Sequence, residues 1–255
     1  MSKLLEGKTA LILGIANKWS LAYAIAQAFS REGATLVLTY LGERQKDSIG
    51  ELAKDFQVGA ILPCDVTKDE DLAALTESLK ALGKPLDAVV HSLAFANRED
   101  LSRPFVETGR DGFQLALDVS AYSLIAVARA TAPVMTEGGS LMTLTYLGST
   151  RVVQSYNVMG VAKAALEAAM RYLANELGAR KIRVNAISSG PVKTASARAI
   201  KGFSSILEVA ARTPLRRNTD PAEVADTAVF LASNLGRGVT GNIIFVDAGM
   251  QIMGF

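Results

Sequence analysis

The sequence predicts a single α/β domain built on a doubly wound parallel sheet of about seven strands, and three observations support this fold class. Short apolar, β-branched segments alternate with amphipathic segments of helical length along the whole chain, which is typical of βαβ units. Right-handed crossovers between such strands give a parallel sheet that is covered by helices on both faces. The strand segments are almost continuously apolar, as at 9–13 and 86–90, which indicates burial on both sides.

The expected elements follow this alternation in chain order. Strands are expected at the short apolar runs, which are residues 8–13, 35–39, 59–63, 88–91, 140–145, 183–187 and 243–246. Helices are expected in the longer stretches between them, at residues 20–32, 43–56, 70–82, 109–132, 155–177 and 221–232. We therefore expect residues 1–255 to form one domain. In such sheets ligands bind beyond the carboxyl ends of the strands, so functional residues are expected at that edge.

One segment, residues 194–212, breaks the alternation. It lies between Pro191 and Pro214, and Phe203 and Ile206 are among the apolar residues that recur there at helical spacing. A surface helix packed on the core would give the same pattern. Because the segment starts directly after a strand end, we favour a mobile lid over a lipophilic pocket.

The composition excludes several classes of protein. A net charge of +2 over 255 residues gives no argument for a nucleic-acid partner. One His and one Cys do not build a zinc site of the usual kind, so no metal is expected. The single cysteine, Cys64, cannot form an intrachain disulfide and fits a reducing compartment. The N-terminus has no apolar core of signal-peptide length, and the apolar stretches fall short of a membrane span, so we expect a cytoplasmic protein without a membrane partner.

A candidate phosphate-binding turn follows the first strand. Gly14 ends the strand and Ser20 begins the next helix, whose free amides and dipole favour a pyrophosphate. Ser20 is placed to cap that helix, to donate its hydroxyl to phosphate, or to do both. Asp65 follows the third strand, where it is placed to accept from an adenine amino group, and Ser92 is one of the small residues after the fourth. Together they predict a Rossmann-type dinucleotide site, and the alternative is a tight turn without a ligand.

The residues after the second strand leave the choice of dinucleotide open. Glu43 suits the ribose hydroxyls of NAD, and Arg44 suits the 2′-phosphate of NADP. Both are equally well explained as surface charges at the start of a helix.

The candidate catalytic residues are Tyr156 and Lys163, which lie in one expected helix. Seven residues at about 100° and 1.5 Å each place them within ~20° of one another on its surface and ~10 Å apart along its axis. A lysine near a phenol lowers the pKa of the phenol and makes it a better proton donor. The simpler explanation is a buried Tyr and a surface Lys in an ordinary helix. His91 and Cys64 are interpreted as structural residues, and Trp19 has no assigned role.

At this point the sequence resembles the short-chain dehydrogenase/reductases over its full length. The similarity is carried by the closing strand at 239–249, VTGNIIFVDAG, and by 183–191, RVNAISSGP. The resemblance implies use of NAD(H) or NADP(H) and a homotetramer. The usual Tyr-x-x-x-Lys signature is missing, because the position four before Lys163 is Met159, and Thr143 and Thr145 occupy the region of the usual serine.

This departure matches one branch of the family, the bacterial enoyl-acyl-carrier-protein reductases of type-II fatty acid synthesis. The similarity lies in Tyr156-x6-Lys163, in Tyr146 within Thr-Tyr-Leu-Gly, and in Gly14-x5-Ser20. The resemblance implies that Tyr156 holds the thioester carbonyl oxygen, that Lys163 binds the nicotinamide ribose and that Tyr146 lines the substrate pocket. The implied cofactor contacts are Gly14, Ile15, Ser20, Leu21, Asp65, Val66, Ser92, Leu93, Lys163, Val192 and Thr194. The implied substrate contacts are Ala96, Tyr146, Tyr156, Phe203 and Ile206, with 194–212 as the substrate-binding loop.

The resemblance also implies the reaction, which is hydride transfer from NAD(P)H to the β-carbon of a trans-2-enoyl thioester carried by acyl carrier protein. We expect NADH as the cofactor and keep NADPH as the alternative, because Leu41 stands where NADH-using relatives often have Gln. Arg198 and Lys201 are placed to meet the acidic carrier, unless they are merely solvated charges. The alternative functions are a 3-ketoacyl or other carbonyl reductase of the same family and a non-catalytic dinucleotide sensor.

Overall fold

The computed structural model describes residues 3–192 and 212–254, and its centre is one parallel seven-stranded sheet. The strand order across the sheet is β3-β2-β1-β4-β5-β6-β7. The strands are β1 (Thr9–Leu13), β2 (Thr35–Tyr40), β3 (Val58–Pro63), β4 (Ala88–His91), β5 (Gly139–Thr145), β6 (Ile182–Ser189) and β7 (Ile243–Val246). The order reverses direction between β1 and β4, which is the switch point where doubly wound sheets bind ligands. The predicted fold class is confirmed.

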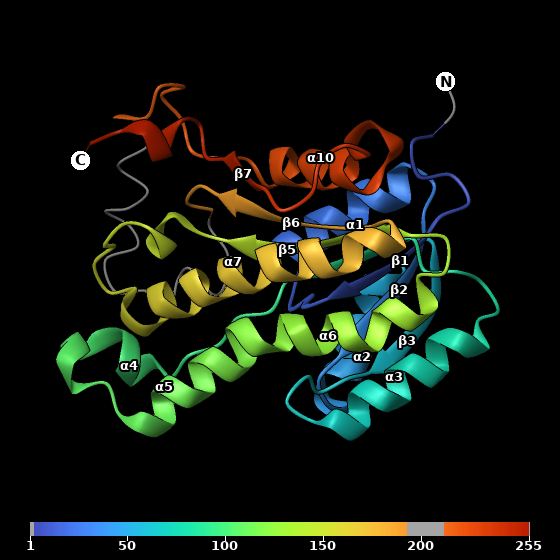
Figure 1. Cartoon of the computed structure of the whole chain (residues 1–255), viewed down its shortest axis with the longest axis horizontal. Coiled ribbons are helices and arrows are strands. Elements are labelled where there is room, and N and C mark those ends of the chain that lie inside the picture. The colour runs from blue at the N-terminus through green and yellow to red at the C-terminus, as the bar shows by residue number, and fades with distance from the viewer. Residues whose placement is uncertain (1–2, 193–211, 255) are drawn as a thin grey trace.

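Helices cover both faces of the sheet (Figure 1). The helices on one face are α1 (Leu21–Arg31), α2 (Glu43–Ala53) and α10 (Pro221–Ala232). Those on the other are α3 (Asp69–Ala81), α6 (Ser123–Thr131) and α7 (Asn157–Leu177). Two shorter helices, α4 (Arg98–Ser102) and α5 (Arg110–Leu117), lie beside the start of α7. Short 3₁₀ turns occupy Phe105–Glu107, Ala132–Val134, Leu147–Ser149, Gly178–Arg180, Asn234–Gly236 and Met250–Ile252.

The strands divide their side chains between two hydrophobic cores. In β1, Leu11 and Leu13 belong to the core under α3, α6 and α7, whereas Ala10 and Ile12 belong to the core under α1, α2 and α10. All five residues of β1 are buried. This is the two-sided burial that the continuous apolar run predicts.

The predicted helix at 109–132 is interrupted. It consists of α5, a π-helical turn at Asp118–Tyr122 and α6. In that turn the buried Ser120 hydroxyl donates to the Phe95 carbonyl oxygen at 3.0 Å and accepts from the Phe95 amide at 2.9 Å. The π turn thus brings a polar side chain against the chain that leaves β4, which helical periodicity alone does not reveal.

The same stretch corrects one expectation. The segment Arg110–Val134 has 25 residues, and an 18-residue window within it has a mean hydropathy of 1.3, so by length and composition it matches a membrane span. The expectation that the apolar stretches fall short of a span is therefore wrong here. However, 61% of the apolar window is buried inside the structure, and Leu124 and Val127 belong to the core shared with α3 and α7. Packing against the sheet explains its apolar composition.

Candidate active site

Gly14 lets the ends of β1 and β4 approach each other closely. Its φ is +94°, and a Cβ added there would overlap the carbonyl oxygen of Ser92 and lie 3.2 Å from Leu93 Cδ2. The Ser92 amide also donates to the Leu13 carbonyl oxygen at 3.2 Å. A side chain at this position would have to push the ends of β1 and β4 apart, so glycine allows the close approach that forms this cradle at the switch point.

Ser20 is the N-cap of α1. Its hydroxyl oxygen accepts from the Tyr23 amide at 3.3 Å, and its hydroxyl donates to the Asn17 carbonyl oxygen at 2.7 Å. The structure contains the capping role, and the hydrogen bond from Ser20 to a phosphate stays a prediction. The dipole and the first amides of α1 face the same edge as Gly14, which is a favourable place for an anion. Ile15, after the glycine, is buried, and Leu21 is half-buried at the start of α1.

Asp65 follows β3 at the same edge of the sheet. Its Oδ1 accepts from the Thr67 amide at 3.0 Å and from the Thr67 hydroxyl at 2.7 Å, and Lys68 Nζ lies 3.6 Å from Oδ2. Burial alone would raise the pKa of Asp65, but the Thr67 hydrogen bonds and the Lys68 charge outweigh it, so the pKa lies below its usual value. Asp65 is therefore an ionised acceptor, and the neighbouring Val66 is buried.

The residues after β2 are exposed. The Leu41 side chain is 58% exposed, and its amide donates to Gln45 Oε1 at 3.1 Å. Glu43 begins α2 and pairs with Lys46 at 3.4 Å. Glu43 and Arg44 both lie on the surface at the helix start. The geometry, like the sequence, therefore does not decide between NAD and NADP.

The backbone around Tyr156 corrects the expected geometry of the catalytic pair. Helix α7 begins at Asn157, and Tyr156 is its N-cap rather than part of its first turn. Ser155 and Asn157 have φ of +61° and +38°, a region that few non-glycine residues adopt. The expected ~20° offset between Tyr156 and Lys163 assumed one continuous helix and does not apply. Tyr156 lies instead between two residues of positive φ.

Tyr156 packs in a small hydrophobic cluster of its own. Its ring lies edge-on to Tyr146, with centroids 5.1 Å apart and an interplanar angle of 71°. Leu101 of α4 and Ala116 of α5 belong to the same cluster, and Ala96 packs against it. Tyr156 is 9% exposed. The predicted substrate residues Ala96, Tyr146 and Tyr156 are thus brought together.

The ionisation of Tyr156 differs from the expectation. Burial raises the pKa of Tyr156 well above its usual value, and the neighbouring Tyr146 and Glu167 raise it further. The prediction that Lys163 lowers this pKa is therefore wrong. The phenol keeps its proton throughout the neutral range, which suits a hydrogen-bond donor better than a base.

Lys163 is buried, with 6% of its surface exposed. Its Nζ donates to the Leu144 carbonyl oxygen at 2.8 Å. Burial lowers the pKa of Lys163 to about 8, although Glu167 acts in the opposite direction. The ammonium thus lies at the carboxyl end of β5 and not on the helix surface, which excludes the simpler explanation of a surface lysine.

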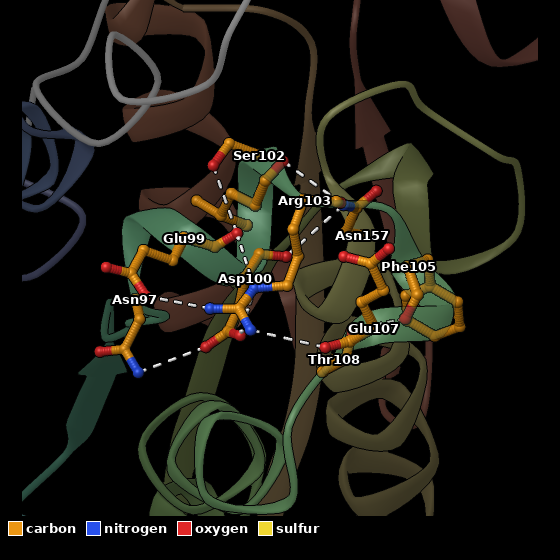
Figure 2. A network of polar contacts seen from close by, with 10 residues as sticks. Asn97, Glu99, Asp100, Ser102, Arg103, Phe105, Glu107, Thr108 and Asn157 are labelled. Atoms are coloured by element: carbon orange, nitrogen blue, oxygen red, sulfur yellow. Dashed lines mark hydrogen bonds and ion pairs between the residues drawn. The ribbon is translucent and has the colours of Figure 1, made fainter.

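A polar network ties the start of α7 to α4 (Figure 2). Asn157 Nδ2 donates to the carbonyl oxygens of Arg103 at 2.8 Å and Leu101 at 3.4 Å, and lies 3.5 Å from that of Asp100. Arg103 in turn pairs with Glu99 at 3.0 Å and with the buried Asp100 at 3.5 Å. The residue after Tyr156 therefore holds the helix that supplies part of the wall around the Tyr156 ring.

The residues interpreted as structural behave as expected. His91 is fully buried, with Nδ1 2.9 Å from Thr143 Oγ1 and Nε2 2.8 Å from Ser123 Oγ. Burial lowers the pKa of His91 to about 3, with help from the charge of Lys163, so the imidazole is neutral. Burial raises the pKa of the Cys64 thiol to about 12, with further contributions from Asp71 and Asp65, and such a thiol is inert.

Some predicted residues lie outside the described part of the chain. These are Thr194, Arg198, Lys201, Phe203 and Ile206, and with them most of the 194–212 segment. Val192, the last residue described before that gap, is buried. Within residues 3–192 and 212–254, no group of three or more His, Cys, Asp or Glu side chains is placed to hold a metal ion.

Sequence reasoning missed three residues of this site. Gly148 has no room for a Cβ because the Tyr156 ring lies against it. Asn157 directly follows Tyr156, and Glu167 lies one helical turn after Lys163, both on α7. The sequence does carry a signal for Glu167, because it is an acidic residue one helical turn after Lys163 in an otherwise apolar stretch of the expected helix. Gly148 and Asn157 carry no such signal, because their roles depend on contacts with segments distant in sequence.

Comparison with known proteins places these features in a family context. The model of the family described as enoyl-(acyl carrier protein) reductase matches residues 14–251. The enoyl-acyl-carrier-protein reductase (NADH) of Bacillus cereus is 54% identical over 99% of this chain and 100% of its own length. The NADPH enzyme of Staphylococcus aureus is 49% identical, covering 97% of this chain and 98% of its own.

Solved structures agree with the sequence comparison. The crystal structure of the Bacillus cereus enoyl-acyl carrier protein reductase with NADP+ and indole naphthyridinone has a TM-score of 0.97 and 54% identity, with 99% of this chain and 100% of that chain covered. The reductase structure from Aquifex aeolicus has a TM-score of 0.95 and 45% identity, with 99% of both chains covered. The similarity includes the whole sheet and both layers of helices.

Proposed function

This chain belongs to the family of enoyl-acyl-carrier-protein reductases, and we propose that Tyr156 is the residue with which it stabilises the reacting thioester. The enzyme is an oxidoreductase that uses NAD(P)H to reduce the double bond of a trans-2-enoyl thioester. The observation that carries the residue assignment is the buried, protonated Tyr156 hydroxyl beside Tyr146 at the carboxyl edge of the sheet.

The cradle at the switch point fits a dinucleotide. Gly14 brings the turns after β1 and β4 together with no side chain between them, and the start of α1 offers amides and a positive dipole end to a pyrophosphate. Asp65 supplies an ionised acceptor for the adenine amino group, and Lys163 a donor for the nicotinamide ribose. Further contacts are proposed from Ile15, Leu21, Val66, Leu93, Val192 and Thr194. When bound, the nicotinamide supplies a hydride to the β-carbon of the substrate.

Tyr156 acts at the other end of the conjugated system, on the thioester carbonyl. Negative charge develops on the thioester carbonyl oxygen, and the phenol donates a hydrogen bond to it. Such a preorganised donor typically contributes ~3 kcal/mol to transition-state stabilisation. Because the pKa of Tyr156 is raised, the phenol retains its proton while the enolate forms. Either water or Tyr156 then supplies the proton that the α-carbon takes up.

The substrate pocket is proposed to lie over the Tyr146 and Tyr156 rings. Ala96 packs against the same cluster and borders that pocket. Phe203 and Ile206 are proposed to contact the acyl chain as well. Because the cradle and the tyrosines stand at one edge of one sheet, we propose that a single domain binds both the cofactor and the substrate.

The carbonyl-reductase alternative is disfavoured by Met159. In the ordinary signature this position carries the proton-donating tyrosine, but Met159 is a buried thioether whose sulfur lies 3.7 Å from Ser120 Oγ. It packs in the cluster with Tyr156 and has no proton to donate. The donor that faces a substrate in this chain is Tyr156.

We propose NADH as the preferred cofactor. Glu43 at the start of α2 would repel the 2′-phosphate of NADPH, while the exposed Arg44 would attract it. Relatives of both kinds are named, with NADH in Bacillus cereus and Bacillus subtilis and NADPH in Staphylococcus aureus. Glu43→Gln should lower KM for NADPH more than KM for NADH, and equal changes would contradict this proposal.

The cellular setting is also proposed. We infer a cytoplasmic homotetramer whose substrate is carried by an acyl carrier protein. The exposed apolar side chains of Phe113, Ile125 and Tyr172 on α5, α6 and α7 support contact with another copy. Light scattering coupled to gel filtration should give four times the chain mass of 27.0 kDa, whereas a stable monomer would contradict the assembly.

Initial rates of nicotinamide oxidation test the reaction itself. We would offer NADH and NADPH separately, each with crotonyl or trans-2-octenoyl thioester and with an acetoacetyl thioester. Oxidation with the enoyl thioesters alone is expected. Oxidation with the acetoacetyl thioester alone would favour the alternative that the protein is a 3-ketoacyl or other carbonyl reductase. Cofactor binding without turnover of any substrate would favour a non-catalytic dinucleotide sensor.

A further inference from the structure

Two side chains one turn apart on α7 hold adjacent residues of β5. Lys163 Nζ donates to the Leu144 carbonyl oxygen at 2.8 Å. Four residues later, Glu167 Oε1 accepts from the Thr145 hydroxyl at 2.6 Å. Residues four apart in a helix lie on the same face, with Cβ atoms about 6 Å apart. The end of β5 is therefore held at two consecutive positions, immediately before Tyr146.

Glu167 is an acidic residue in a buried, apolar part of α7, which is unusual. Glu167 is only 4% exposed, and apolar residues such as Leu166 and Met170 surround it along α7. A carboxylate is costly to bury unless it is compensated by hydrogen bonds and by an opposite charge. The Thr145 hydroxyl supplies the hydrogen bond, and Lys163 is the buried cation on the same helix face.

The charge of Lys163 depends on its surroundings. Burial favours the neutral amine, and the neighbouring carboxylate favours the ammonium. The other titratable groups around it are His91 of β4, which is neutral, and the phenols Tyr146 and Tyr156, which are protonated at neutral pH. Among these groups Glu167 is the one whose charge stabilises the ammonium.

We propose that Glu167 is a positioning residue of the enzyme: its buried carboxylate keeps Lys163 charged for cofactor binding and anchors Thr145, so that Tyr146 stays beside Tyr156. The inference rests on the proposed role of Lys163 as the group that binds the nicotinamide ribose. It adds a second, indirect role, because Glu167 acts only through Lys163 and Thr145.

The test is the pH dependence of NADH binding, measured from nicotinamide fluorescence without substrate. Lys163 is charged below its pKa, so affinity should fall as pH rises through about 8 in the parent enzyme. Glu167→Gln keeps an acceptor for Thr145 but removes the charge. The midpoint of the pH profile of NADH affinity should therefore move down by about one pH unit. A midpoint equal to the parent's would overturn the proposal.

Two matched variants separate charge from structure. Glu167→Asp keeps the charge, so its midpoint should stay with the parent's. Thr145→Val removes the hydrogen bond and leaves the carboxylate, so it should keep the midpoint while lowering kcat with an enoyl thioester. A shifted midpoint in either variant would show that the pH effect comes from altered packing and would overturn the proposal.

Folding and the proposed function have their own controls. Should Glu167→Gln fail to fold, the double variant Lys163→Met, Glu167→Gln should fold again, because both buried charges on this face of α7 are then removed together. A double variant that stays unfolded would overturn the proposed compensation between the two charges. Lys163→Met alone should bind NADH more weakly than the parent. If Lys163→Met binds NADH as well as the parent does, the proposed function of Lys163 is refuted. If Lys163→Met binds NADH weakly but Glu167→Gln keeps the parent's midpoint, only the inference about Glu167 is refuted.

Discussion

Replacing Gly148 with alanine tests how closely Tyr156 must be positioned. Gly148 lies in the 3₁₀ turn Leu147–Ser149 after β5, and its backbone does not adopt a positive φ, so alanine fits the backbone without strain. The added Cβ would lie 2.8 Å from Tyr156 Cε1, nearer still to Cδ1, and 3.4 Å from Tyr146 Cδ1. The substitution therefore acts on the tyrosine ring and on little else.

The size of the effect follows from these distances. Ordinary contact begins at 3.4 Å, so the Tyr156 ring has to move by about 1 Å. A displacement of this size at a reacting group can lower turnover about 100-fold, which corresponds to ~2.7 kcal/mol of activation free energy. Overpacking should also lower the free energy of unfolding by about 1–3 kcal/mol.

The assay is kcat with trans-2-octenoyl thioester, alongside the NADH dissociation constant and urea unfolding. Gly148→Ala should lose turnover and keep its affinity for NADH, because the cradle at Gly14 is untouched. Gly50→Ala in α2 is the matched control, since nothing lies within 4 Å of its Cβ, and alanine should stabilise that helix by about 0.5–1 kcal/mol. A folded Gly148→Ala enzyme with parental kcat would refute the link between the Tyr156 position and catalysis.

Three further substitutions or treatments probe the surroundings of the site. Asn157→Gly tolerates a φ of +38° but loses the hydrogen bonds to the carbonyl oxygens of Leu101 and Arg103. The free energy of unfolding in urea should therefore fall by about 1–3 kcal/mol, and an unchanged value would contradict the role of this network. His91 is neutral when folded and has a pKa of about 3 against 6.5 when unfolded, so its contribution to stability is complete above pH 6.5 and falls by ~1.4 kcal/mol per pH unit below it. The parent should thus lose about 2 kcal/mol more than His91→Gln between pH 7 and pH 5, and parallel losses would contradict a buried neutral imidazole. Cys64 should react with a thiol reagent only after denaturation, and rapid labelling of the native protein would contradict its burial.

The sheet was predictable because its signals are local. Apolar runs such as 9–13 and 88–91 identify strands by themselves, and the strands observed begin and end within two residues of the expected positions. Their alternation with helices determines a parallel sheet, because right-handed crossovers leave few other arrangements. Residues that follow strand ends, such as Gly14 and Asp65, then gather at one edge.

The features that were missed depend on contacts between distant segments. Helix α4 has only five residues, Arg98–Ser102, too few for a periodic pattern. In the π turn at Asp118–Tyr122, Ser120 hydrogen-bonds to Phe95, a contact that the sequence does not display.

The catalytic pair shows the same limit. The spacing of Tyr156 and Lys163 predicted that both lie at the site, and that role stays a prediction, but the spacing argument assumed a helix that starts at Ser155. The positive φ values of Ser155 and Asn157 move the tyrosine off that helix. Burial, which spacing cannot report, raises the pKa of Tyr156 and lowers that of Lys163.

The most direct test of the account is the turnover of Tyr156→Phe with trans-2-octenoyl thioester and NADH. The substitution removes one hydroxyl and keeps the ring that packs against Tyr146 and Gly148. We expect a 10²–10³-fold lower kcat, the usual effect of removing one donor of about 3 kcal/mol, with an unchanged dissociation constant for NADH. A kcat equal to that of the parent would contradict the role of the Tyr156 hydroxyl.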